Sequence, residues 1–447
     1  MATWSVVPNL AKWVKQMSEP LHGRLSWRLL PVLIGLLFAQ GRRTYASALR
    51  GNGLSLDFKQ FYYFLGSLGR VVGPVASRLL RLLAANLPLG DRLLFALDDT
   101  ATKRYGPHVE GAGIHHNPTP GPADQKFLFG HVWVTVSWIL VHPLWGVLGL
   151  PLRAMLYIRK KDLPKLDPDL RKQFPFQTKL QLAGQLVHWL VDWLKFLGKP
   201  IWIVADGGYA KLTFIRAARK AGVTLVSRLR KDAALRSVPQ APRPGEPKRR
   251  GRKPKYGKKR ISLAKRAGSK KGWQQASFTL YGKCMVKTFK TFLATYAPAD
   301  GLIRVVPVKE TASWVAFFCT NPDATVEEIL TAVADRAVIE QNFHDIKEVH
   351  GAGQQQVRHI FANLAVFNLT LWLHTLIELW AWDQPAKKLR DRRTSPWDNP
   401  DRRPSHADRR NSLRRQCIQH TFSPRWGLRR LKGKSARLVK ALLQMVA

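Results

Sequence analysis

Residues 93–100 read Leu-Leu-Phe-Ala-Leu-Asp-Asp-Thr, and residues 201–208 read Ile-Trp-Ile-Val-Ala-Asp-Gly-Gly. Short apolar runs that end in polar turn residues are typical of buried strands. A helix is expected between them, with Thr178 as its N-cap and its end at Gly198. Strands that alternate with helices predict an α/β sheet covered by helices.

Around this centre the chain divides into three predicted regions. Residues 1–90 are expected to be helical, and residues 91–385 to hold the α/β fold. Residues 386–447 form an Arg-rich tail. Within the middle region, strand-like runs are expected over about 225–320, around a basic segment at 244–273 that interrupts them.

Two outer segments have properties that suit DNA. A helix, a Gly-rich turn and a second helix are predicted across residues 42–65, with Ser55 as the second N-cap. This unit could dock on DNA or be an ordinary packed hairpin, and the sequence favours neither. The run from Arg402 to Arg410 is expected to be a DNA contact or a partly disordered arm.

The net charge points to a polyanionic partner. The chain has 447 residues, with 73 Lys+Arg against 29 Asp+Glu, and a formal net charge of +44. Such a surplus repels itself unless a polyanion neutralises it, so nucleic acid is the first expected partner and an anionic membrane the second. In the basic segment, Arg250, Arg252 and Lys253 are predicted to bind DNA phosphates, as a flexible clamp rather than by insertion into the minor groove.

No membrane span is expected. Residues 131–152 contain no charged residue and are long enough to cross a bilayer. They also hold two His and two Pro residues and are rich in Val and Trp, which predicts two buried strands at about 131–141 and 144–152. The three cysteines form no CxxC pair, so neither a zinc module nor a disulfide framework is indicated and a cytoplasmic location fits.

A few acidic residues stand out in this basic chain. Asp98 (or Asp99) and Asp206 follow apolar runs, where sites form in open α/β folds. A long helix is predicted from the capping box at Thr325 to about His350. It carries Glu340, with Arg336 and Lys347 within about 40° on the same helix face.

Three carboxylates from distant segments can hold two Mg²⁺ ions, with Mn²⁺ as a substitute, for phosphoryl transfer. Simpler interpretations remain open. Asp98-Asp99-Thr100 and Asp206-Gly207-Gly208 could be plain turns, and Arg336 with Glu340 an ordinary helical ion pair. His344 and His350 flank this region, and such histidines are more often core or surface residues than metal ligands.

The sequence resembles the DDE transposases of bacterial insertion sequences. It is most similar to the subgroup whose third acidic residue lies in the signature Tyr-x2-Arg-x3-Glu-x6-Lys. Arg336, Glu340 and Lys347 match that spacing, whereas Val333 replaces the Tyr. The Asp-x-Thr strand end maps the first catalytic Asp onto Asp98, and Asp206 resembles the second.

The resemblance implies an RNase H-like catalytic core with a β-strand insertion, an N-terminal helical domain that could bind DNA ends, and a basic C-terminal tail. It implies metal-dependent cleavage at element ends and strand transfer into target DNA by a homodimer, in a bacterial cytoplasm and close to the nucleoid. Arg336 and Lys347 would hold phosphates beside the metal ions. The alternative is a catalytically inert DNA-binding protein derived from such a transposase.

Overall fold

The computed structural model describes residues 4–54, 56, 58–117, 125–240, 251, 254–393 and 395–426. The α-helices are α1 (Pro8–Met17), α2 (Gly23–Ser26), α3 (Leu29–Phe38), α4 (Tyr45–Gly51), α5 (Phe58–Arg70), α6 (Val72–Asn86), α7 (Pro168–Gln173), α8 (Lys179–Leu194), α9 (Leu212–Lys220), α10 (Leu263–Gly268), α11 (Val326–Asp335), α12 (Val338–Glu348), α13 (Ile360–Ala381), α14 (Ala386–Leu389) and α15 (His406–Trp426). The strands are β1 (Leu93–Lys103), β2 (Gly113–His116), β3 (Phe127–His142), β4 (Gly146–Tyr157), β5 (Ile201–Ala205), β6 (Thr224–Leu229), β7 (Leu235–Arg236), β8 (Arg260–Ile261), β9 (Gln274–Leu280), β10 (Lys283–Phe289), β11 (Phe292–Tyr296), β12 (Gly301–Lys309) and β13 (Trp314–Cys319).

The centre of the molecule is a mixed sheet. Strands β4, β3 and β1 pair antiparallel, and β1, β5 and β6 pair parallel. The inner strands are almost wholly buried, since β5 has no exposed residue. This mixed α/β arrangement confirms the predicted fold class and is consistent with an RNase H-like nuclease core.

Strand β1 extends beyond the turn considered at Asp98-Asp99-Thr100. The turn interpretation is wrong, because β3 lies alongside and pairs with β1 from Leu94 to Lys103. A strand end is nevertheless present on the other side, where the parallel pairing with β5 stops at Leu97 opposite Ala205. The two predicted strands at 131–141 and 144–152 are confirmed as β3 and β4, both longer than expected.

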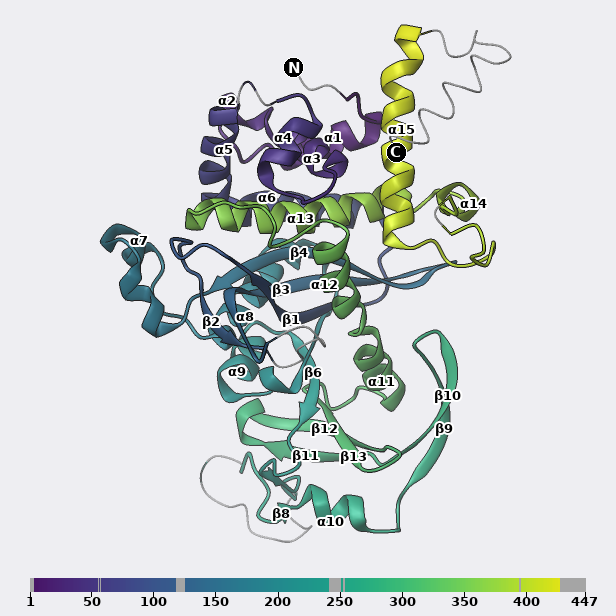
Figure 1. Ribbon diagram of the computed structural model, residues 1–447. Coiled ribbons are helices and arrows are strands. Elements are labelled where there is room, and N and C mark those ends of the chain that lie inside the picture. The colour runs from purple at the N-terminus through teal and green to yellow at the C-terminus, as the bar shows by residue number, and fades with distance from the viewer. Residues whose placement is uncertain are drawn as a thin grey trace.

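The later strands extend the same sheet. Strand β13 pairs antiparallel with β6 and is followed in the sheet by β12, β11, β7 and β8. Strands β9 and β10 form a hairpin that projects away from the sheet and curves outward beside α11 (Figure 1). The boundaries of the predicted insertion stay a prediction.

Helix α13 separates the sheet from the N-terminal helices (Figure 1). Trp133 of β3 stacks on Phe367 of α13 with ring centroids 4.2 Å apart. On the opposite side α5 crosses closely, because a Cβ at Gly69 would collide with the backbone carbonyl of Phe361. The face of the sheet at β3, the helix α13 and the N-terminal helix α5 therefore share one hydrophobic core.

The predicted helical hairpin near the N-terminus is present as α4 and α5. Thr44 caps α4, since its hydroxyl accepts a hydrogen bond from the Ser47 N–H at 3.0 Å. Ser55, the predicted cap of the second helix, lies outside the described residues, and α5 begins at Phe58. The buried side of α5 packs on α13, as an ordinary packed hairpin does.

Helix α13 is also long and apolar enough to cross a membrane, by length and composition alone. Most of its apolar stretch is buried inside the protein. Core helices of soluble proteins share these properties, so the burial is consistent with a soluble protein.

The long helix predicted from Thr325 to His350 is interrupted. It forms α11 and α12, with Arg336 and Ala337 between them. The backbone stays in the αR region, but some hydrogen bonds there join residues three apart instead of four. For example, the Ile339 N–H donates to the Arg336 C=O at 3.0 Å. The tighter turn displaces α12 from the axis of α11 (Figure 1).

Part of the Arg-rich tail is internal. Arg409 and Arg410 are 3% and 5% exposed. Arg409 pairs with Glu378 of α13, and Arg410 donates to the carbonyl of Leu37 at 2.7 Å. These two arginines therefore do not form the DNA contact or partly disordered arm expected from the sequence.

The predicted capping box at the start of α11 is confirmed. The Thr325 hydroxyl accepts from the Glu328 N–H, and the Glu328 carboxylate accepts from the Thr325 N–H at 2.8 Å. We expect Thr325→Ala to lower the free energy of unfolding by about 1 kcal/mol. Glu327→Ala, in the same turn but outside the box, should change it by less than about 0.5 kcal/mol in urea denaturation. Equal losses in the two variants would contradict the role of the cap.

Candidate active site

One arginine joins two of the three predicted carboxylates. Arg336 follows α11, and its guanidinium lies 2.7 Å from Asp98 Oδ2 of β1 and 3.0 Å from Glu340 Oε1 of α12. Asp98 and Arg336 are each 20% exposed at the side chain, whereas Glu340 is 64% exposed. The fold thus brings residue 98 beside residues 336 and 340, as the sequence predicted.

The third predicted carboxylate follows the neighbouring strand. Asp206 comes directly after β5, at the point where the parallel pairing of β1 and β5 ends. Its side chain is exposed and accepts a hydrogen bond from the Gly208 N–H at 3.3 Å, which starts a short 3-10 turn. Asp206 is near enough to raise the pKa of Asp98.

Asp98 has a strongly perturbed carboxyl group. Burial raises its pKa to about 6, and the charges of Asp99 and Asp206 add to this effect. The Arg336 guanidinium and the Asp99 N–H act in the opposite direction. A cation beside Asp98 therefore stabilises its ionised form.

Asp99 is engaged by different partners. Its two oxygens lie 2.6 Å from Lys179 Nζ of α8 and 2.8 Å from the hydroxyl of Tyr209. Neighbouring residues on a strand point to opposite faces, so these contacts turn Asp99 away from Arg336. Of the two alternatives left open by the sequence, the geometry favours Asp98, because it is the aspartate that shares Arg336 with Glu340.

The remaining predicted residues differ in what the structure describes. Lys347 lies half-buried in the last turn of α12. Arg250, Arg252 and Lys253 lie outside the described residues. Val333, which replaces the signature Tyr, packs half-buried against the core.

The donor set suits hard divalent cations. Asp98, Asp206 and Glu340 offer carboxylate oxygens, the ligands that Mg²⁺ prefers. Arg336 supplies one positive charge between two of them, and the raised pKa of Asp98 shows that this charge does not offset burial and the neighbouring acids. A divalent ion would compensate these charges more fully.

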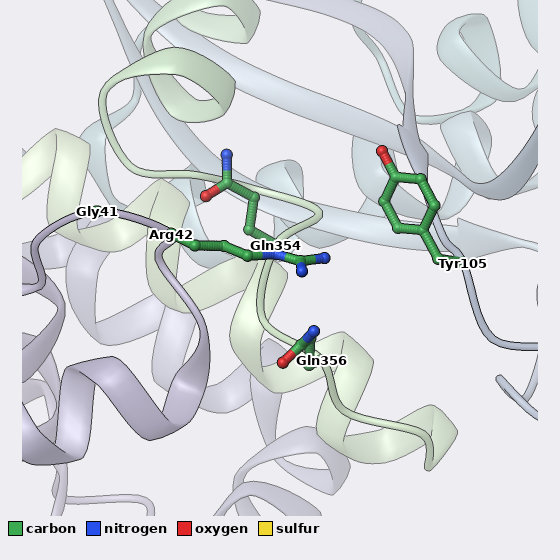
Figure 2. Close-up of a pocket in the computed structure, with 5 residues that line it drawn as sticks. All are labelled: Gly41, Arg42, Tyr105, Gln354 and Gln356. Atoms are coloured by element: carbon green, nitrogen blue, oxygen red, sulfur yellow. The ribbon is translucent and has the colours of Figure 1, made fainter.

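A surface hollow lies apart from the carboxylates. It has a volume of about 810 Å³ and is lined by Gly41, Arg42, Tyr105, Gln354 and Gln356 (Figure 2). The Arg42 guanidinium lies 6.0 Å from the centre of the Tyr105 ring. None of these lining residues is one of the three carboxylates.

Sequence reasoning missed two residues around the acidic pair, Lys179 and Tyr209. Tyr209 directly follows Asp206-Gly207-Gly208, and its place next to this motif is the feature of the sequence that could have indicated it. Lys179 follows the predicted N-cap Thr178, and nothing local indicates that it reaches Asp99.

Comparison with known families agrees with this geometry. The sequence profile described as DDE superfamily endonuclease matches residues 18–281, more than half of the chain. The chain belongs to this family, which implies a metal-dependent nuclease that acts on DNA. Asp98 and Asp206 lie within the matched range, whereas Glu340 lies beyond it. No curated protein matches the chain.

Proposed function

We propose that this chain is a cut-and-paste DNA transposase that cleaves the ends of an insertion sequence and joins them to target DNA. The observation that carries the proposal is the bridge of Arg336 between Asp98 and Glu340, with Asp206 at the neighbouring strand end. Carboxylates drawn from two strands and a helix are the arrangement that a two-metal phosphoryl-transfer site requires. The match of Arg336, Glu340 and Lys347 to the subgroup signature supports the same assignment.

Asp98, Asp206 and Glu340 are proposed as the ligands of two Mg²⁺ ions, for which Mn²⁺ can substitute. When bound, the ions would activate a hydroxyl nucleophile and stabilise the leaving oxygen. Asp98 holds its place through the backbone pairing of β1 with β3 and β5. Glu340 lies on α12 and is exposed enough to meet DNA.

Arg336 has a second proposed role. Its guanidinium is the charge partner of Asp98 and Glu340 in the absence of DNA and metal. Divalent ions at the carboxylates would release it to bind a backbone phosphate, for which its planar donors are suited. Lys347, further along α12, would hold a phosphate as a point charge.

The proposed partners are transposon ends and target DNA, bound by a homodimer in a bacterial cytoplasm close to the nucleoid. The net charge of +44 supports a polyanionic partner. Arg250, Arg252 and Lys253 of the basic segment are proposed as further phosphate contacts, because a run of basic residues supplies affinity for DNA of any sequence.

The test is cleavage of a DNA fragment that carries the element's own end. We expect the unchanged protein to cut it with Mg²⁺ but not with EDTA, and Asp206→Asn to bind without cutting. Asp192→Asn, at an exposed position of α8, is the matched control and should cut normally. Tight binding without cutting under any divalent metal would contradict the proposal.

One observation favours a second candidate, an inert DNA-binding protein derived from a transposase. Arg336 already pairs with Asp98 and Glu340, so these carboxylates have a charge partner without any metal ion. Nicking of supercoiled plasmid separates the candidates. A transposase nicks it when Mg²⁺ or Mn²⁺ is present, and an inert binder does not under any metal.

A further inference from the structure

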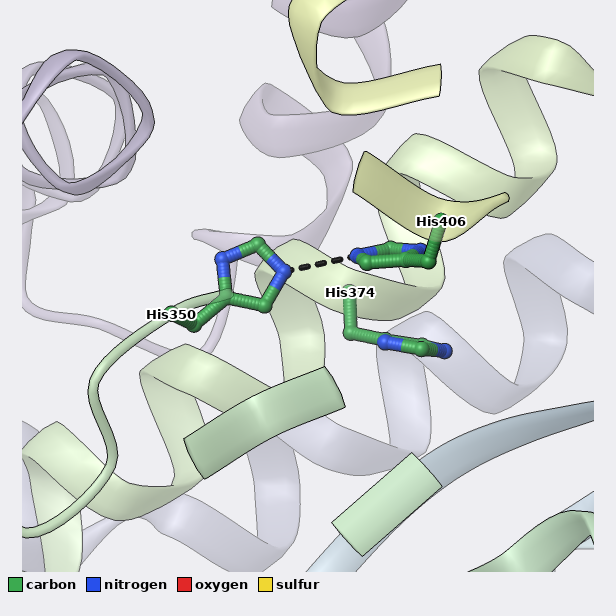
Figure 3. Close-up of side chains that lie close together, drawn as sticks. All are labelled: His350, His374 and His406. Atoms are coloured by element: carbon green, nitrogen blue, oxygen red, sulfur yellow. Dashed lines mark hydrogen bonds between the residues drawn. The ribbon is translucent and has the colours of Figure 1, made fainter. Parts of the chain in front are cut away.

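Three buried histidines, none of them part of the proposed carboxylate site, lie close together (Figure 3). His350 follows α12, His374 lies on α13, and His406 is the first residue of α15. Their exposed fractions are 2%, 2% and 5%. Each histidine thus comes from a different part of the fold.

The three imidazoles are close enough to share one ion. His350 Nε2 lies 2.7 Å from His406 Nε2, and the rings of His374 and His406 are stacked with centroids 3.8 Å apart. One nitrogen from each ring lies within 4.8 Å of the other two. This is the sole group of three or more His, Cys, Asp or Glu residues with such spacing among the described parts of the chain.

The hydrogen bonds leave one nitrogen of His374 without a partner. His374 is bonded to the backbone of Gly149, and its Nδ1 has no partner, so Nε2 makes that bond. His350 Nδ1 also lacks a partner, but it lies on the side of the ring away from His406, which Nε2 faces (Figure 3). A buried nitrogen without a partner is costly, and an ion at the centre of the group would satisfy His374 Nδ1.

His406 is oriented from behind by a carboxylate. Its Nδ1 lies 2.5 Å from Glu378 Oε1, and Glu378 in turn pairs with Arg409 at 2.8 Å. Burial alone would raise the pKa of Glu378, but Arg409 and His406 hold that pKa below its usual value. An ionised carboxylate behind a histidine fixes the tautomer that presents Nε2, as around metal-bound histidines.

We propose that His350, His374 and His406 form a site for one divalent transition-metal ion, with Zn²⁺ as the preferred occupant. Imidazole nitrogen suits zinc and its neighbours in the transition series, whereas Mg²⁺ prefers oxygen. The ligands are His350 Nε2, His406 Nε2 and His374 Nδ1, with Glu378 behind His406. Zn–N distances of about 2.0–2.1 Å place tetrahedral ligands roughly 3.3 Å apart. Binding therefore replaces the bond between His350 and His406, moves the His350 proton from Nε2 to Nδ1, and turns the stacked His374 ring toward the ion.

The ion would connect three parts of the fold. His350 lies two residues after α12, the helix that carries Glu340 and Lys347, and His406 begins α15. An ion held by His350, His374 and His406 would fix the end of α12 against α13 and α15. Because its three ligands are buried and none is one of the proposed catalytic carboxylates, the proposed role of the ion is structural.

The first experiment uses the untagged full-length chain with zinc alone. We expect one Zn²⁺ per chain to remain bound after dialysis. A nitrogen-donor chelator that does not bind Mg²⁺ should remove this zinc and lower the melting temperature of the protein. Co²⁺ in its place should give the visible absorption of a nitrogen-ligated tetrahedral ion without a thiolate band. A chain that binds neither zinc nor cobalt at stoichiometric amounts overturns the proposal.

Substitutions then assign the ligands. His374→Gln and His406→Gln should each weaken zinc binding more than about 100-fold, and Glu378→Gln about 10- to 100-fold. His344→Gln, whose side chain is 64% exposed on α12, is the matched control and should bind zinc as the unchanged chain does. If all four variants bind the same amount of zinc, the assignment of the ligands is overturned. If a variant fails to fold, the cobalt spectrum of the unchanged chain decides whether nitrogen atoms ligate the ion.

Discussion

Replacing Glu340 by Gln is expected to lower DNA-end cleavage about 10³-fold or more, with binding to the same DNA within a few-fold of the unchanged protein. Gln keeps the size of the side chain and an oxygen that can accept from Arg336, so the bridge to Asp98 has little reason to move. The substitution removes one negative charge from the proposed metal site. Cleavage rate and a mobility-shift assay, measured on one DNA fragment, check the two halves of the expectation.

Two matched controls sharpen this test. Glu348→Gln, exposed at the end of the same helix, should leave cleavage unchanged. Asp98→Asn should abolish cleavage as Glu340→Gln does, whereas Asp99→Asn should retain it, because Asp99 contacts Lys179 and Tyr209 instead. Loss of cleavage and DNA binding together in Glu340→Gln would indicate misfolding and contradict its assignment as a ligand.

Replacing Arg409 by Ala is expected to lower the free energy of unfolding by about 3–5 kcal/mol. Arg409 makes two contacts of 2.8 and 2.9 Å with Glu378, and both side chains are almost fully buried. Without the guanidinium, the Glu378 carboxylate stays buried and loses its arginine partner, while His406 remains beside it. The measurement is urea denaturation followed by circular dichroism.

The control lies on the same helix. Arg415 pairs with Asp391 at 3.0 Å, but its side chain is 21% exposed and Asp391 keeps Arg393 as a second partner. Arg415→Ala should therefore cost no more than about 1 kcal/mol. If Arg409→Ala is no worse than Arg415→Ala, the buried pair does not stabilise the fold in the way that its burial suggests.

Several elements could be predicted because their causes are local. Short apolar runs at 93–97 and 201–204 form buried strands, and Thr178 and Thr325 cap their helices as their neighbours require. The pair of Arg336 and Glu340 follows from a spacing of four residues, and it survives the change of helix axis between α11 and α12.

Other features depend on partners that the local sequence does not reveal. Strand β1 continues past Asp98 because β3 lies beside it, and Asp99 pairs with Lys179 because the fold brings α8 to it. The interruption at Arg336 is equally invisible, since both helices and the residues between them have helical backbone angles.

The sequence by itself determined the class of the fold, the acidic residues that follow its short apolar runs and the basic character of the chain. The tertiary structure alone decided which aspartate shares Arg336 with Glu340, that Arg409 belongs to the core, and that His350, His374 and His406 meet. The physical reason is the range of the interactions. Caps, apolar periodicity and helical ion pairs act within a few residues, whereas a buried charge or imidazole finds its partner only after chain segments far apart in the sequence have packed together.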